Sequence, residues 1–161
     1  MMKHVVRVVS IEGPVHETEI VLRIRSLWGL ARAGNRIRDS VLAAVRAAKR
    51  KGDIVGGPFY SVPGQEVLVR DRNGIESNTL RKPEYLPPEE IKVAISRLVA
   101  ENFGAELEQL VQAVARIFGF GATSGQLREV VEGALNELLE SGKLRLDGRL
   151  VTQVQAESAS A

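Results

Sequence analysis

The sequence predicts a mainly α fold with small β-hairpins, an α+β class, built as a tandem repeat of one unit. Two observations predict it: apolar residues recur at helical spacing in several segments, and the two halves of the chain match when one is displaced by 90 residues. Composition agrees, because 44% hydrophobic and 26% charged residues over 161 positions are typical of a globular protein. The absence of cysteine excludes disulfides, cysteine-based metal sites and thiol catalysis.

The displacement by 90 residues aligns the halves without a gap. Eight residues in the first half are identical to the residue 90 positions later: Arg7, Val9, Val21, Gly29, Arg38, Val41, Ala44 and Gly52. At further aligned positions the two residues differ but both are apolar, for example Ile24 and Val114, or Trp28 and Phe118. We therefore interpret the chain as two copies of one supersecondary unit.

Both copies follow one order of elements: helix, short strand, helix, turn, helix, hairpin. In copy one these are expected at 3–11, 14–16, 17–28, 35–51 and 54–62, and in copy two at 88–102, near 105, 106–118, 125–141 and 143–152. This order is that of the winged helix-turn-helix, in which the hairpin is the wing. The sequence therefore predicts a tandem winged helix-turn-helix repeat.

The hairpin of copy two has the clearest turn signal. Asp147 and Gly148 supply the positive φ values that a two-residue turn requires, and strict alternation places Leu144 and Leu146 on one face. The predicted domains are a winged helix at 1–62, an ordered linker at 63–87, a second winged helix at 88–154 and a disordered tail at 155–161. Within the linker we expect a strand at 67–72 and a turn at Asn73 and Gly74.

Charge is distributed unevenly along the chain, although the whole carries a formal net charge of only +2. Residues 1–62 hold 11 Lys and Arg against 5 Asp and Glu, whereas residues 93–161 hold 6 against 9. A basic half and an acidic half are not expected to share one partner surface.

Several segments carry a resemblance to a known family. They read EGPVHETEI, RIRSLWGLARAGNRIRDSV, LRKPEYLPPEEI and IFGFGATSGQLREVV, and together they span about residues 3–152. The chain resembles a bacterial domain family of unknown function, found toward the C-terminus of large helicase-like proteins with a superfamily-one ATPase core and often a nuclease domain. The resemblance implies that helicase or nuclease domains of a parent protein are partners. It supplies no catalytic residues to carry over.

The third helix of copy one is the predicted nucleic-acid-binding element, since this helix of a winged helix can enter the major groove. A helical wheel places apolar residues on one side and polar and cationic residues on the opposite side and its flank. Arg32 in the preceding turn and Lys51 at the helix end add to this surface. The residues predicted to contact nucleic acid are therefore Arg32, Asn35, Arg36, Arg46, Lys49, Arg50 and Lys51. The alternative is a solvated face that serves solubility alone.

Copy two provides an internal comparison. Its equivalent outer positions are Gly125, Gln126, Glu129, Gly133, Asn136 and Glu140, which would repel or fail to grip a phosphate backbone. Copy two is therefore expected to be a protein-docking or spacer module. Its hairpin is basic, so a weaker contact between this hairpin and phosphate is the alternative.

Residues that occupy equal positions in both copies are interpreted as structural. Arg38 and Arg128 are expected to have buried stems and bonded guanidinium groups, and Trp28 and Phe118 are expected to lie in the cores. His16 is expected in a strand or at a helix cap.

Enzymatic function is not expected. The glycine-rich stretch 119–125 follows a helix and lacks the lysine of a phosphate loop, so it is interpreted as a helix-turn-helix corner with Thr123 or Ser124 as the cap. Neither His4 nor His16 has neighbouring metal ligands, and no apolar run is long enough for a membrane span. The sequence predicts a cytoplasmic, non-catalytic, DNA-binding accessory module without cofactor, metal, membrane or small-molecule substrate; a protein-docking or structural module is the alternative.

Overall fold

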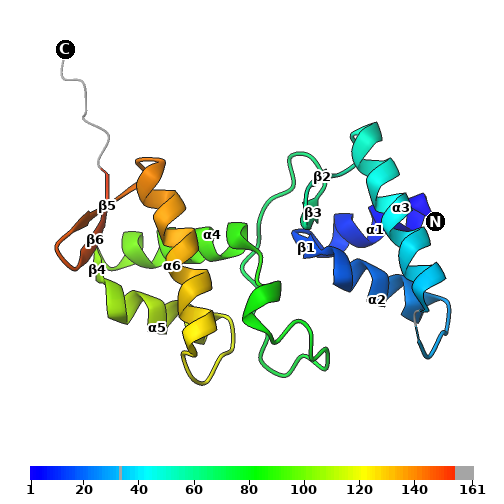
Figure 1. Ribbon diagram of the computed structural model, residues 1–161. Helices are drawn as coiled ribbons and strands as arrows, with labels where there is room; N and C mark the ends of the chain where they lie inside the picture. The colour runs from blue at the N-terminus through cyan, green and yellow to red at the C-terminus, as the bar shows by residue number, and fades with distance from the viewer. Residues whose placement is uncertain (33, 155–161) are drawn as a thin grey trace, which may run out of the picture. The chain divides into compact units, whose positions relative to one another are not determined.

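The computed structural model describes residues 1–32 and 34–154, so the tail expected at 155–161 lies outside the described residues. The chain divides into two compact units, Met1–Val67 and a second that begins at Leu68 (Figure 1). The segment 63–87, expected as a linker, is shared between the units, and each unit is described by itself below.

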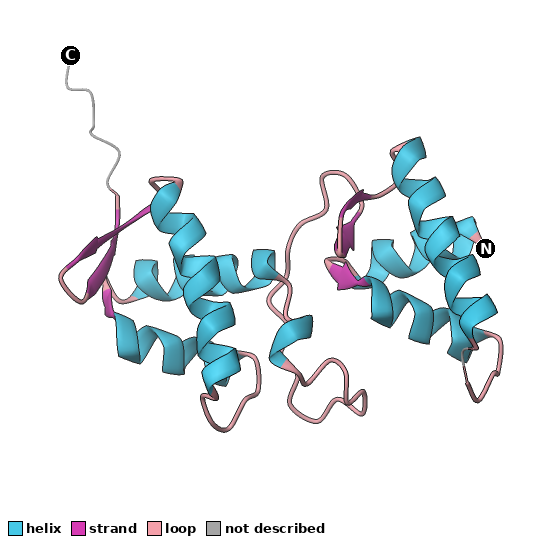
Figure 2. Cartoon of the chain, viewed as in Figure 1, coloured by secondary structure: helices cyan, strands magenta, loops and turns pink. Residues whose placement is uncertain are grey.

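In its described residues, unit one contains three helices and three short strands (Figure 2). In chain order they are α1 (Met2–Glu12), β1 (Val15–His16), α2 (Glu17–Leu27), α3 (Asn35–Lys51), β2 (Val55–Gly56) and β3 (Phe59–Ser61). The strands form an antiparallel sheet in the order β1-β3-β2, in which Val15 pairs with Tyr60 and Gly56 pairs with Tyr60 from the other side.

Unit two has the same order of elements after a short 3₁₀ helix, η1 (Pro83–Tyr85). The elements are α4 (Pro88–Glu101), β4 (Ala105–Glu106), α5 (Leu107–Ile117), α6 (Gly125–Glu140), β5 (Leu144–Asp147) and β6 (Leu150–Gln153). Its antiparallel sheet has the order β4-β6-β5. The fold is therefore of the α+β class, with helices predominating.

Local chemistry fixes several helix ends. The Nδ1 atom of His16 accepts a hydrogen bond from the Thr18 amide at 3.1 Å and caps α2, and Ser124 Oγ accepts one from the Leu127 amide at 3.2 Å and caps α6. Both caps satisfy an amide that the first turn of a helix leaves without a partner. At the other end, α3 stops at Gly52, whose φ of +83° favours glycine.

Each unit has its own hydrophobic core. In unit one Val41, Val45 and Ala48 of α3 are buried together with residues of α1 and α2, and Ile37, the first apolar residue of α3, is half-buried at the edge of the core. In unit two the core includes Phe118 at the end of α5. No helix in the described ranges is both long enough and apolar enough to cross a membrane.

The expectation that Trp28 and Phe118 both lie in cores is wrong for Trp28. Phe118 is fully buried, whereas Trp28 is 43% exposed. The difference comes from the segment after Leu68: the Arg72 amide donates a hydrogen bond to the Phe118 carbonyl at 3.2 Å, and the Arg72 guanidinium lies 5.1 Å from the centre of the Phe118 ring. No described segment of unit one covers Trp28 in this way.

The second hairpin also differs from the prediction. Asp147 pairs with Leu150, so the two-residue turn consists of Gly148 and Arg149 rather than Asp147 and Gly148. Leu144 is buried, but Leu146 on the same face is 41% exposed because it lies toward the hairpin tip, beyond the core. Val15 of the first strand pairs with Tyr60 in unit one, and Ala105 pairs with Val151 in unit two. Val15 and Ala105 are 90 residues apart, whereas Tyr60 and Val151 are 91 residues apart. The second hairpin therefore holds one extra residue.

The strand expected at 67–72 is not formed; these residues have no ladder pairing, and a turn follows at Asn73 and Gly74. Their conformation is set instead by a buried carboxylate, Glu90, in the first turn of α4. Glu90 accepts hydrogen bonds from the Arg70 amide at 3.3 Å, from the Arg70 guanidinium, and from Arg72 Nη1 at 3.1 Å. The carboxylate thereby fastens the segment onto α4.

Replacing Glu90 with Gln should destabilise unit two by about 3 kcal/mol, because Arg72 would remain buried without its counter-charge. The measurement is denaturant unfolding of the full chain, compared with the exposed neighbour Glu89→Gln as a control. Equal midpoints for the two variants would contradict the role assigned to Glu90.

Candidate nucleic-acid interface

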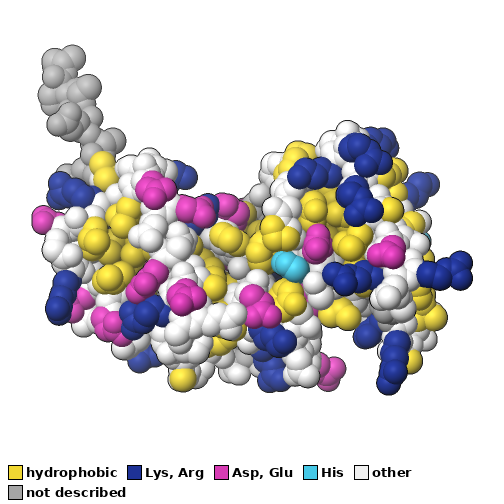
Figure 3. Space-filling model, viewed as in Figure 1, with side chains coloured by type: hydrophobic (Ala, Val, Ile, Leu, Met, Phe, Trp, Pro, Cys, Tyr) yellow, Lys and Arg dark blue, Asp and Glu magenta, His cyan; other side chains and the backbone are white. Residues whose placement is uncertain are grey.

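The helix α3 has two opposite faces. Its inner face carries Val41, Ala44, Val45 and Ala48, all buried. The residues expected to contact nucleic acid are all exposed: Arg32 in the preceding turn, and Asn35, Arg36, Arg46, Lys49, Arg50 and Lys51 on the helix. In Figure 3 dark blue side chains gather over the part of unit one that contains α3. The structure thus places six of the predicted residues on the accessible side of one helix or at its ends, and Arg32 in the turn before it.

Three of these residues form a narrow cationic row. At 100° per residue, Arg36, Arg46 and Arg50 fall within an arc of about 80°, and they extend over about 21 Å of helix axis. None of the three has an ion pair within the described part of the chain. Their charges are therefore available to an external anion, although the exposed carboxylate of Asp39 shares the same face.

The other cations of α3 lie less centrally. Lys49 is on the flank of the helix, and Lys51 Nζ is 3.4 Å from Asp53 Oδ2. This ion pair offsets the charge of Lys51, so Lys51 is expected to contribute less to anion binding than Arg46 or Arg50.

Arg38 is a residue that the repeat comparison assigned incorrectly. It is exposed, and its guanidinium makes no hydrogen bond or ion pair within the described residues, so it adds a further cation to the flank of α3 beside Lys49. Its counterpart does have the expected carboxylate partners: Arg128 Nη2 lies 2.6 Å from Glu108, and Arg128 Nη1 lies 3.2 Å from Glu132. The hydrogen bond from Arg128 lowers the pKa of Glu108 below its usual value.

The hairpin of unit one lies close enough to α3 for their charges to interact. Tyr60 of β3 is buried, and this burial raises the pKa of its hydroxyl above the ordinary value; the Glu17 carboxylate raises the pKa further, and the Arg46 guanidinium opposes the shift. Next to Tyr60, the hairpin residues Val55, Gly56, Gly57 and Pro58 are exposed. A ligand bound on the Arg46 side of α3 would therefore lie near the hairpin.

The corresponding helix of unit two carries no comparable row. Gln126, Glu129, Asn136 and Glu140 are exposed on α6, and Gln126 Nε2 donates a hydrogen bond to Glu84 Oε2 at 2.7 Å. Two exposed carboxylates and neutral side chains give this face no attraction for a polyanion.

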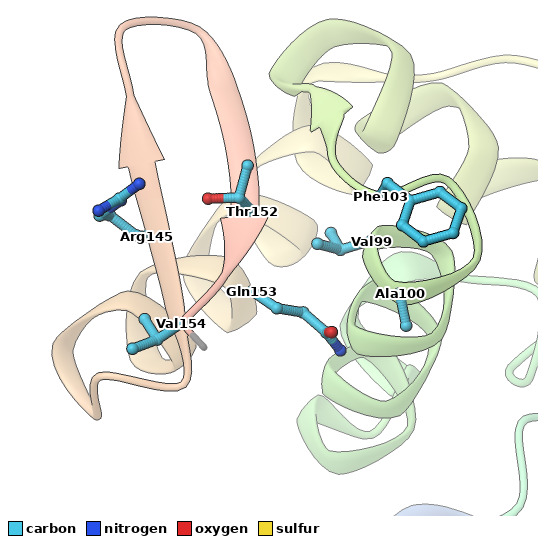
Figure 4. A pocket seen from close by; sticks show the side chains of 7 residues that line it. All are labelled: Val99, Ala100, Phe103, Arg145, Thr152, Gln153 and Val154. Atoms are coloured by element: carbon cyan, nitrogen blue, oxygen red, sulfur yellow. The ribbon is translucent and has the colours of Figure 1, made fainter. Parts of the chain in front are cut away.

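Unit two instead has a cavity of about 760 Å³, lined by both apolar and polar side chains, between the end of α4 and the hairpin β5–β6 (Figure 4). Val99 and Ala100 line it from α4, and Thr152 and Gln153 line it from β6. Phe103 stands at its rim, 96% exposed and with a positive φ of 55°. Sequence reasoning missed this feature, since nothing local distinguishes an exposed phenylalanine from a core one.

Across the described ranges, no group of three or more His, Asp or Glu side chains is arranged to hold a metal ion.

Comparison with known protein families gives a match to part of unit one. Residues 1–39 match the family described as "Protein of unknown function (DUF3320)", a range that covers α1, β1, α2 and the first turn of α3. No curated protein and no solved structure matches the chain.

Proposed function

We propose that the chain is a DNA-binding accessory module made of two winged helix-turn-helix domains, with unit one making most of the contacts. The observation that carries this proposal is the unpaired row of Arg36, Arg46 and Arg50 on the exposed face of α3. Arginine binds phosphate oxygens and, in the major groove, guanine O6 and N7. Asn35, Arg32 and the flanking lysines extend the same surface.

The order of elements supports this assignment. In each unit a helix, a strand and two helices precede a hairpin, and the first strand pairs with the last strand of that hairpin. In a winged helix the third helix is the one that enters the major groove, and the hairpin lies beside it. The influence of Arg46 on Tyr60 agrees with a hairpin next to α3.

The partners follow from the sequence resemblance. The match of residues 1–39 to a family of unknown function agrees with the family noted from the sequence, and we propose that helicase or nuclease domains of a parent protein are placed on DNA by this module. Any nucleotide hydrolysis would then belong to those other domains, and the module would work in the cytoplasm.

Salt dependence tests the proposal. Binding of the full chain to random duplex DNA should weaken steeply with salt, with a log–log slope of about −0.9 per phosphate contacted. For roughly three to five contacts, affinity should fall about 40- to 500-fold between 50 and 200 mM salt. Fluorescence anisotropy of a labelled duplex measures this slope, and no binding even at low salt would contradict the proposal.

Protein docking is the second candidate function, and one observation favours it. Phe103 is almost fully exposed beside a cavity that it shares with Val99 and Val154, and such exposure is unusual for a large aromatic side chain in water. Docking through unit two is compatible with DNA binding through unit one. A chain that fails to bind DNA at low salt would leave docking as the function of the whole module.

A further inference from the structure

Unit two contains a second cavity, of about 470 Å³, whose lining is rich in hydrogen-bond donors. The segment after Leu68 forms one side of it, and the turn between α5 and α6 forms the other. Its lining residues are Arg72, Asn78, Arg81, Lys82, Phe118, Gly119, Phe120 and Gly121. Three of them are cations and none is a carboxylate.

Arg72 is buried at this cavity with part of its guanidinium unused. The residue is 3% exposed, and its Nη1 atom donates to the Arg70 carbonyl at 2.6 Å and to Glu90 at 3.1 Å. Neither Nε nor Nη2 makes a hydrogen bond within the described residues, and Nε is fully buried without a partner. Because Nε is enclosed by protein atoms, Nη2 is the guanidinium donor of Arg72 that remains for a ligand in the cavity.

Further positive charge at the cavity comes from Arg81 and Lys82. Glu90 forms ion pairs with both Arg70 and Arg72, whereas Arg81 and Lys82 are exposed without an ion pair in the described part of the chain. Arg81 Nη2 donates to Asn78 Oδ1 at 2.8 Å, which holds its guanidinium at the rim while its other donors remain available.

The glycine-rich turn supplies the opposite wall. A side chain at Gly119 would clash with the 71–73 turn, because a Cβ there would lie 2.5 Å from the Asn73 amide nitrogen, so glycine lets these two turns pack closely. The carboxylate of Asp71, next to Arg72 in the chain, accepts a hydrogen bond from the Asn73 amide at 2.8 Å. The Gly121 amide donates to no acceptor within the described residues, and nothing would contact a Cβ there, so its backbone is open to a ligand.

We propose that this cavity is a binding site for a phosphate group, contacted by Nη2 of Arg72, by Arg81 and Lys82, and by the Gly121 amide. Guanidinium, ammonium and backbone N–H donors around one cavity are the groups that bind phosphate oxygens in proteins. The phosphate belongs either to a free phosphate compound or to a nucleic-acid backbone. The site differs from a phosphate loop because the turn follows a helix, and it does not depend on α3 of unit one binding DNA.

The first experiment titrates the full chain with inorganic phosphate and pyrophosphate and follows amide signals by NMR. The Gly121 signal should shift and saturate, and Arg81→Gln with Lys82→Gln should weaken binding about tenfold or more, since each charge-assisted contact is strong. The matched control is Arg145→Gln with Arg149→Gln, which removes two exposed cations from the hairpin of the same unit and should leave binding unchanged.

A second arm distinguishes the source of the phosphate. In a chain that already carries Arg36→Glu and Arg46→Glu, residual binding to a short DNA duplex is measured with and without the Arg81 and Lys82 changes. If the Arg81 and Lys82 changes abolish duplex binding and the Arg145 and Arg149 changes do not, the site binds a backbone phosphate. If the Arg81 and Lys82 changes weaken only the binding of phosphate and pyrophosphate, the site binds a free phosphate compound. Equal behaviour of the two double variants in both arms, or an unmoved Gly121 signal, would overturn the proposal.

Discussion

Changing Arg36 and Arg46 of α3 to glutamate should nearly abolish duplex DNA binding while the protein remains folded. Each reversal removes one attraction to the phosphate backbone and adds one repulsion, and affinity for DNA depends strongly on such contacts. Both side chains are exposed without ion pairs in the described part of the chain, so neither change disturbs a contact of the fold. Anisotropy titration measures binding, and a thermal melt of the same sample checks the fold.

The matched control lies on the equivalent helix of unit two. Gln126→Glu with Asn136→Glu introduces two negative charges on the exposed face of α6 and should change DNA binding little. Equal losses from the two pairs would mean that both units contact DNA. Unchanged binding in the arginine pair would exclude α3 as the interface.

Replacing Val41 with Asp should unfold unit one. Val41 is fully buried in the core of that unit together with Ile20, Ile24 and Val45, so a carboxylate there would have no water and no counter-ion. We expect a loss of about 5 kcal/mol or more, which is comparable to the whole stability of a small domain. Because unit two has a separate core, its amide signals should persist in an NMR spectrum while those of unit one collapse.

The control for this change is Ala43→Asp, two residues along the same helix on the exposed face. It adds the same charge with almost no burial, so its melting curve should remain close to that of the parent chain. If Val41→Asp and Ala43→Asp melt alike, the assignment of the inner and outer faces of α3 is wrong.

The helices and their order could be predicted from the sequence because the signals are local. The predicted third helix of copy one, 35–51, coincides with α3 (Asn35–Lys51), since its apolar stripe is regular and Gly52 ends it. The caps at His16 and Ser124 were predictable for the same reason, because a capping side chain bonds an amide two or three residues away. The exposed row of Arg36, Arg46 and Arg50 follows directly from the helical period, once the buried stripe is known.

Contacts between distant segments decided the rest. The repeat predicted equal roles for Trp28 and Phe118 and for Arg38 and Arg128, yet Phe118 is covered by Arg72 and Arg128 is bonded to Glu108, while their counterparts remain exposed. The covering segment was itself expected to be a strand, but its conformation is set by Glu90, which lies 18 residues from Arg72. The proposed phosphate pocket also depends on distant segments. Some of its donors precede α4 in the chain, and the others follow α5. Local periodicity therefore determined which residues form helices and which side of α3 is charged. Only the tertiary structure decided which equivalent residues are buried, since burial depends on the segment that packs above them.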